Sequence, residues 1–169
     1  MKKVRRNLVV LIVIAGVTAA AAAAAITQID PNTVPKGFLV ANNAVQTPLK
    51  VKVVGGPEHV LPDGADTYVL HGAIPPGGST GWHSHAGTEF VMMVNGALTL
   101  YDGDDKTCTG TTYAAGRGFV DRGFGHIHIA RNEGSVPAEF YAFYELPAGA
   151  GDAGVKIPEP GFSNPACNF

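Results

Sequence analysis

The chain has 169 residues, with 12 Lys and Arg against 14 Asp and Glu, and only 15% of its residues are charged. A nearly neutral chain without a basic patch does not predict nucleic-acid binding. Its 22 Gly and 12 Pro separate many short apolar runs. This pattern favours a single all-β domain with a hydrophobic core over a helical bundle.

The first 25 residues differ from the rest. Four basic residues come before residue 7, and residues 8–25 carry no charge. Ala23 to Ala25 provide a small-residue cleavage site, so we predict a secretory signal peptide over residues 1–25 and an exported protein. The alternative is an uncleaved anchor over residues 8–25, because 18 apolar residues just span a bilayer. Only an uncleaved anchor of this kind would bring the protein into contact with a membrane.

The remaining chain divides into three parts. Residues 26–44 are predicted to be a lead-in segment, residues 45–147 to hold the strands, and residues 148–169 to be an irregular, Gly- and Pro-rich tail. Asn95-Gly96 separates two apolar runs and predicts a hairpin. From alternation and turn residues, strands are expected at 45–54, 67–74, 90–94, 97–101, 111–113, 118–121, 126–131 and 138–146.

The most informative motif is Gly77-x5-His83-x-His85-x3-Glu89-x6-Gly96. In a strand, side chains alternate between faces, so His83 and His85 point the same way. Glu89 has the same parity and returns to that face if the backbone bends at Ala86-Gly87, where glycine supplies the freedom. Two imidazoles and one carboxylate suit a divalent metal ion, including non-haem Fe(II).

A second cluster follows at His126-Ile127-His128-Ile129, where polar and apolar residues alternate strictly. A strand there places both histidines on one face, so either is a candidate for a further metal ligand. The spacing alone does not choose between them.

Cys108 and Cys167 are the two cysteines of the chain. An even count in an exported protein predicts one disulfide, which would attach the tail to the region before the second cluster.

Together, the two clusters resemble the paired motifs of the cupin superfamily. Residues 77–96 satisfy every specified position of the family's first motif, and residues 123–132 fit the end of the second, with Gly123 in place of a proline. The resemblance implies a single jelly-roll β-barrel (a double-stranded β-helix) over about residues 45–147. It also makes His128 the fourth ligand, beside His83, His85 and Glu89.

The resemblance implies one divalent transition metal as the cofactor. We favour Fe or Mn, and Ni, Cu and Zn remain open because imidazole and carboxylate bind all of them. The expected partner is a small molecule, and a homodimer is possible because such barrels often pair. His126 would be a hydrogen-bonding neighbour of His128, a catalytic acid or base, or simply a strand histidine satisfied by a neighbour.

Two classes of function are left open by these residues. The protein is either a metal-dependent oxygenase- or oxidase-type enzyme acting on a small polar molecule, or a cupin module that holds a metal or small molecule without turnover. The fold does not decide between them.

Overall fold

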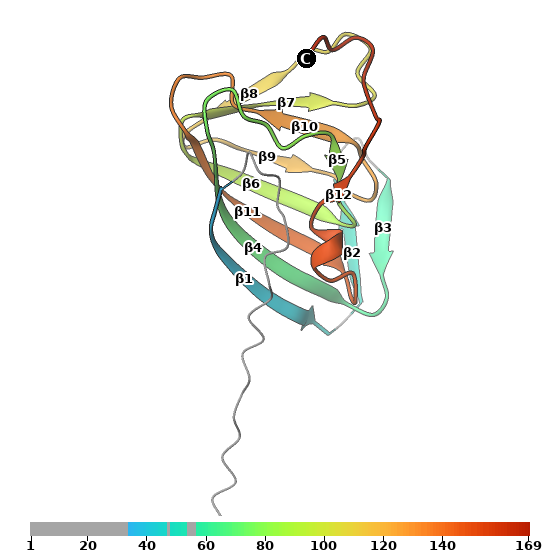
Figure 1. Cartoon of the computed structure of the whole chain (residues 1–169). Helices are drawn as coiled ribbons and strands as arrows, with labels where there is room; N and C mark the ends of the chain where they lie inside the picture. The colour runs from blue at the N-terminus through green and yellow to red at the C-terminus, as the bar shows by residue number, and fades with distance from the viewer. Residues whose placement is uncertain (1–33, 47, 54–56) are drawn as a thin grey trace, which may run out of the picture.

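The computed structural model of this protein describes residues 34–46, 48–53 and 57–169 (Figure 1). The predicted signal peptide or anchor, residues 1–25, lies outside the described residues. Among the residues that are described, no helix is long and apolar enough to cross a membrane.

The described chain is built from strands and a single turn of 3₁₀ helix, η1 (Asp152–Gly154). The strands are β1 (Val34–Val45), β2 (Leu49–Lys52), β3 (Glu58–Leu61), β4 (Ala65–Ile74), β5 (His83–Ser84), β6 (Thr88–Asn95), β7 (Ala97–Asp102), β8 (Thr111–Ala114), β9 (Gly118–Asp121), β10 (His128–Arg131), β11 (Ala138–Pro147) and β12 (Ile157–Pro158).

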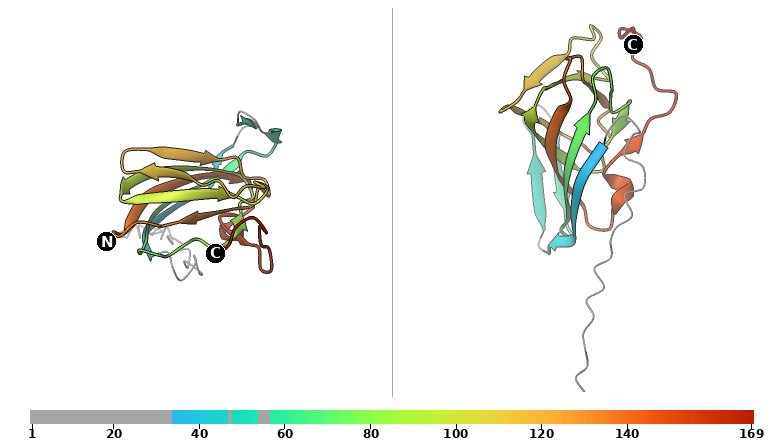
Figure 2. Two further views of the ribbon diagram at one scale, coloured as in Figure 1. Left: turned by 90° about the horizontal axis from the view of Figure 1, so that it is seen from above. Right: turned by 60° about the vertical axis from the view of Figure 1, so that its left-hand side comes forward.

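Two five-stranded antiparallel sheets form the body of the molecule. The first has the order β1-β4-β11-β6-β9 and the second the order β12-β5-β10-β7-β8, while β2 and β3 form a separate pair. Both sheets curve around a shared interior, as the views in Figures 1 and 2 show. This arrangement is a jelly roll, and the all-β prediction is confirmed.

The core lies between the two sheets and follows from the two-residue period of the strands. On β11, alternate residues Phe140, Ala142, Tyr144 and Leu146 are buried, and on the neighbouring β6 so is Val91. Because inward-facing residues of both sheets fill one interior, any polar side chain on these faces is enclosed by apolar packing.

The predicted hairpin at Asn95-Gly96 is wrong, although the turn itself is present. Gly96 has φ +63°, as a tight turn requires. However, β6 pairs with β11 and β9, whereas β7 pairs with β10 and β8. The turn therefore carries the chain from one sheet to the other, since a turn sequence specifies a reversal and not the partner of each strand.

Both ends of the described chain contribute more strand than expected. β1 lies largely within residues 26–44, which we expected to be a lead-in, and it pairs with β4 from Val34↔Ala73 to Val45↔Ala65. In the tail expected to be irregular, β12 pairs with β5. Two residues are too few for alternation to show, so β12 leaves no pattern in the sequence.

The predicted disulfide is confirmed. Cys108 and Cys167 are bonded, with their Cα atoms 5.2 Å apart and 59 positions apart in sequence. The bond ties the end of the chain to the loop between β7 and β8, on the sheet that also carries β10 and β12.

Candidate metal centre

The two sheets each contribute one row of polar residues to the interior. In the first sheet, Tyr144 of β11 pairs with Glu89 of β6, and Glu89 pairs with Asp121 of β9. In the second sheet, His128 of β10 pairs with His83 of β5. Strand pairing therefore aligns residues that are far apart in the sequence, and all five side chains are at most 6% exposed.

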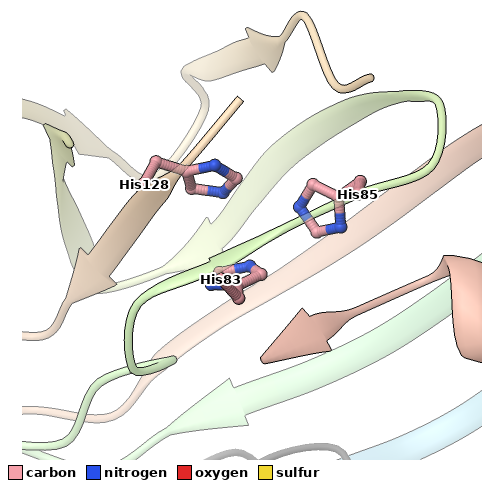
Figure 3. Close-up of side chains that lie close together, drawn as sticks. All are labelled: His83, His85 and His128. Carbon is pink, nitrogen blue, oxygen red and sulfur yellow. The ribbon is translucent and has the colours of Figure 1, made fainter. Parts of the chain in front are cut away.

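Three histidines converge in this interior. His83, His85 and His128 each offer a ring nitrogen within 4.8 Å of the others. Figure 3 shows the rings of His83 and His85, from one segment, turned toward the ring of His128 on the neighbouring strand. His83 and His85 thus turn the same way, as predicted, and one histidine of the second cluster, His128, joins them.

Glu89 lies beside the three histidines. Its Oε2 atom is 3.2 Å from Nε2 of His85 and 4.0 Å from Nε2 of His128. The chain bends at Ala86 and Gly87, as predicted, before β6 begins. The glycine is needed there for space, because a Cβ atom on Gly87 would lie 2.1 Å from the carbonyl oxygen of Glu145 on β11.

Each histidine holds its Nδ1 atom against an oxygen, which leaves Nε2 for the interior. Nδ1 of His83 donates to the carbonyl of Gly81 at 2.8 Å, and Nδ1 of His85 donates to the carbonyl of Val155. Nδ1 of His128 lies 3.3 Å from Oδ1 of Asp121. Histidines that bind metals are oriented in this way, because the outer hydrogen bond fixes the tautomer that exposes the lone pair.

The electrostatics of the site favour a bound cation. Burial raises the pKa of Glu89, but the neighbouring His85 and its hydrogen bond outweigh this, so the pKa lies below its usual value and the carboxyl is ionised. Burial, followed by the charges of His128 and His85, holds the pKa of His83 well below 6.5, so its ring is neutral. The carboxylate of Glu89 and the ring of His83 can therefore both accept a cation. Burial lowers the pKa of His85, but the charge of Glu89 and the hydrogen bond to it outweigh this and raise the pKa.

Tyr144 supports Glu89 from the adjacent strand. Burial first, and then the charge of Glu89 and the hydrogen bond to it, raise the pKa of Tyr144 well above 10. The phenol therefore remains protonated and donates to the carboxylate, which fixes one oxygen of Glu89.

The residues fit a divalent transition metal. Nε2 of His85 is buried and faces Oε2 of Glu89 at 3.2 Å, so an imidazole nitrogen and a carboxylate oxygen adjoin in the interior. Three imidazole nitrogens with a carboxylate at hand suit Fe, Mn and other divalent ions, and leave coordination positions open.

A cavity of about 40 Å³ adjoins the histidines. Its far walls are apolar, so a molecule in contact with the imidazoles is shielded from water on several sides. The residues that line it are Leu70, Thr80, His83, His85, Glu89, Val91, Leu98, Phe119, His128, Ala130, Phe140, Tyr144, Val155 and Lys156.

The sequence reasoning missed Asp121, which is 2% exposed. Its carboxylate accepts a hydrogen bond from the backbone N–H of Gly123 at 2.7 Å and from Nδ1 of His126 at 2.5 Å. Burial raises the pKa of Asp121, but the hydrogen bond from His126 and the charges of His128 and its neighbours outweigh this and lower it. A signal was present, since a lone carboxylate ends a strand just before the second motif.

Val155 and Lys156 were also missed. They belong to the predicted irregular tail, yet Val155 orients His85 through its carbonyl and both residues line the cavity. Backbone carbonyls carry no residue-specific signal, so this contact could not be predicted from the residue types.

His126 lies behind the site and does not line the cavity. Residues 126 and 127 precede β10, so the strand predicted from residue 126 begins two residues late. Besides its bond to Asp121, His126 places Nε2 3.2 Å from Oδ1 of Asp102. Asp121 lies between His126 and His128 and contacts both rings. The predicted catalytic role of His126 stays a prediction.

Gly123 occupies the position where the resemblance leads one to expect proline. Its φ is +66°, which a proline ring cannot adopt. A Cβ atom there would lie 1.7 Å from the carbonyl oxygen of Gly87. The departure from the motif is thus explained by a close backbone contact between the two segments that carry the histidines.

Comparison with known proteins agrees with this geometry. Residues 70–144 match the family described as Cupin domain. Residues 70–144 therefore form a cupin-type domain. This match spans both histidine clusters and the strands β6, β7, β8, β9 and β10 that lie between or beside them, so the cupin motifs and the matched region coincide.

Similar solved structures are more distant. They include a sugar phosphate isomerase of the cupin superfamily from Silicibacter pomeroyi (27% identity over 47% of this chain and 50% of that chain, TM-score 0.40). An oxalate oxidase (22%, 48% and 43%, TM-score 0.43) and a predicted oxalate decarboxylase from Thermotoga maritima (21%, 64% and 98%, TM-score 0.41) are others. The match to the first two spans half or less of their length. A search of curated proteins found no match.

Proposed function

We propose that this cupin domain binds one divalent transition metal through His83, His85, His128 and Glu89, with Fe or Mn favoured. The observation that carries the proposal is the common orientation of the three histidines. Their Nδ1 atoms are turned toward outer oxygens, while their other ring nitrogens gather in a buried cavity. Such an arrangement gathers three imidazole nitrogens beside a carboxylate, a donor set that suits a divalent transition metal.

A bound metal ion would supply a Lewis acid and a template for a small ligand. The protein's own residues would do the rest. Glu89 would balance part of the ion's charge, and Tyr144 holds Glu89 by donating a hydrogen bond. Nδ1 of His128 bonds to the backbone carbonyl of His126 and lies 3.3 Å from the carboxylate of Asp121. The apolar walls keep bulk water from the reacting molecule.

We infer that the protein is exported and acts as an oxygenase- or oxidase-type enzyme on a small polar molecule. The disulfide supports an oxidising compartment, and the predicted signal peptide over residues 1–25 supports export. The small, enclosed cavity beside open metal positions supports chemistry on a molecule of few atoms.

The alternative is a cupin module that holds a metal or small molecule without turnover. Among the residues that line the cavity, the groups able to transfer a proton are the four proposed ligands and two others, Tyr144 and Lys156. The lack of a further acid or base favours this alternative. His126 would act here as a positioning residue, through Asp121, in place of an acid or base that touches the substrate.

Oxygen uptake separates the two proposals. The Fe(II)- and Mn(II)-loaded proteins are screened against small hydroxy acids, keto acids and diols with an oxygen electrode, beside the His85→Ala variant. Uptake that depends on both substrate and His85 supports the enzyme. Metal bound at one equivalent with no uptake in any pair favours the module.

A further inference from the structure

A second group of potential metal ligands lies outside the cavity of the metal centre. Asp102, Asp104 and His126 each offer one ligand atom within 4.8 Å of the others. Asp104 and His126 line a separate cavity of about 240 Å³, which shares no lining residue with the cavity beside the three histidines. An ion held in this second cavity is therefore distinct from one held in the first.

The backbone brings these three side chains together. β7 ends at Asp102, and the next N–H group, that of Gly103, donates to the carbonyl of Ile127 at 2.8 Å. Asp102 and Asp104 flank this glycine, and His126 precedes the isoleucine. The bond therefore sets the two carboxylates against the imidazole.

The turn that carries the carboxylates is fixed by other parts of the chain. The side-chain amide of Asn164 donates to the carbonyls of Asp102 and Asp105, at 3.3 and 2.7 Å. The carboxylate of Asp105 accepts from the backbone N–H groups of Thr107 and Thr109, at 2.9 and 2.6 Å. Asp105 is thus engaged within the turn, and the turn holds its neighbours in a preorganised position.

His126 is oriented as a metal ligand would be. Its side chain is 9% exposed, and Nδ1 donates to the buried carboxylate of Asp121 at 2.5 Å. In the neutral ring, that bond keeps the proton on Nδ1 and leaves the lone pair on Nε2, as in the carboxylate–histidine pairs that support bound metals. Nε2 is buried and lies 3.2 Å from Oδ1 of Asp102, but it is not hydrogen-bonded to it. The ring therefore presents a buried nitrogen to the carboxylates.

Arg122 is a basic residue that contacts the group. Its guanidinium lies 3.3 Å from Oδ2 of Asp104, and both side chains are exposed. An exposed pair of this kind contributes little free energy, so it does not prevent Asp104 from turning an oxygen toward an ion. With Asp121 behind His126, three carboxylates adjoin the imidazole, and one guanidinium offsets part of their charge.

We propose that Asp102, Asp104 and His126 form an outer site that takes one divalent transition metal ion. One imidazole and two carboxylates suit Mn(II) or Zn(II), with further positions left for water. The outer site shares no ligand with the metal centre, although Asp121 contacts both His126 and His128 and would support one ligand of each ion. Asp102 and Asp104 are 50% and 72% exposed, so the outer ion should dissociate on dialysis and return when metal is added.

The rival explanation is that His126 is an imidazolium that only bridges Asp121 and Asp102. Metal ions would then be attracted to this turn by its surface charge alone. In that case, removing the charge of Asp104 or of its neighbour Asp105 would weaken metal binding equally. A specific site depends on Asp104 and not on Asp105, whose carboxylate is bonded to the turn.

The test is a titration of the metal-free protein with Mn(II), in which electron paramagnetic resonance counts the free ion. We expect the wild type to bind two equivalents, the second more weakly. Asp104→Asn should weaken the second by about tenfold or more, since even the loss of a partner behind a metal ligand costs 10- to 100-fold. Asp105→Asn removes the same charge from the same turn and should change it by less than about threefold, because exposed charges are screened.

A further variant, His85→Ala, separates the outer site from the metal centre. It should lose the tighter equivalent and keep the one that depends on Asp104. The inference is overturned if no bound Mn(II) responds to Asp104→Asn, or if Asp105→Asn weakens binding as much. A wild type that binds only the ion dependent on Asp104 would instead refute the proposed metal centre and leave the outer site standing. Because Asp104 is 72% exposed, its substitution should not disturb folding.

Discussion

Gly123 and Gly125 form a natural pair for testing how the two segments that carry the proposed ligands are held together. Both have positive φ, +66° and +83°, so alanine is strained at either position, at a cost of about 1–2 kcal/mol. The two positions differ in the room available for a Cβ atom. A Cβ atom on Gly125 meets nothing within 4 Å, whereas one on Gly123 would lie 1.7 Å from the carbonyl oxygen of Gly87. Only backbone movement can relieve that contact.

Gly125→Ala should therefore lower the free energy of unfolding by about 1–2 kcal/mol, which is the backbone strain alone. Gly123→Ala should lower it by more than about 4 kcal/mol, a loss found when a buried backbone contact must open. Urea unfolding of the metal-free proteins, followed by tryptophan fluorescence and circular dichroism, gives both values. Losses within about 1 kcal/mol of each other would refute the argument that close approach to Gly87 fixes residue 123 as glycine.

Three further predictions concern the tail, the histidines and the second motif. Replacing Cys108 and Cys167 by alanine should lower the free energy of unfolding by about 4 kcal/mol, from a loop of 59 positions, and a loss under about 1 kcal/mol in urea would contradict this. His83 has a pKa below the unfolded value of about 6.5, so protonation favours the unfolded chain. The metal-free protein should lose stability as pH falls below 6.5, and His83→Asn should lose less between pH 7.5 and 5. Asn132→Ala should cost about 2–3 kcal/mol, because the buried amide donates to the carbonyls of Ile74 and Val136, while Asn95→Ala, at an exposed turn, should cost under 1 kcal/mol.

The proposed ligands could be found from the sequence because they depend on local rules. Two histidines one residue apart share a face in any extended segment, and the parity of Glu89 and the bend at Gly87 return the carboxylate to the same side. The disulfide could be predicted because only two cysteines are present. The choice of His128 over His126 needed the family resemblance, since the spacing of the second cluster allowed both.

The rest of the site depends on long-range pairing, which local patterns do not encode. The row of Tyr144, Glu89 and Asp121 exists because β11, β6 and β9 lie side by side. The sequence of a single strand does not indicate which strands pair with it. The same limit made the turn at Gly96 look like a hairpin. Likewise, Val155 and Lys156 reach the cavity from a Gly- and Pro-rich tail whose two-residue strand shows no periodicity.

The central claim is that three histidines and a glutamate hold one metal ion. It is tested most directly by plasma mass spectrometry of protein recovered from an exporting host, as wild type, His85→Ala and His126→Ala. We predict about one equivalent of Fe or Mn in the wild type, most of it lost in His85→Ala and retained in His126→Ala, because the ring of His85 lines the cavity and that of His126 does not. A folded wild-type protein without metal, or equal loss in both variants, would contradict the account.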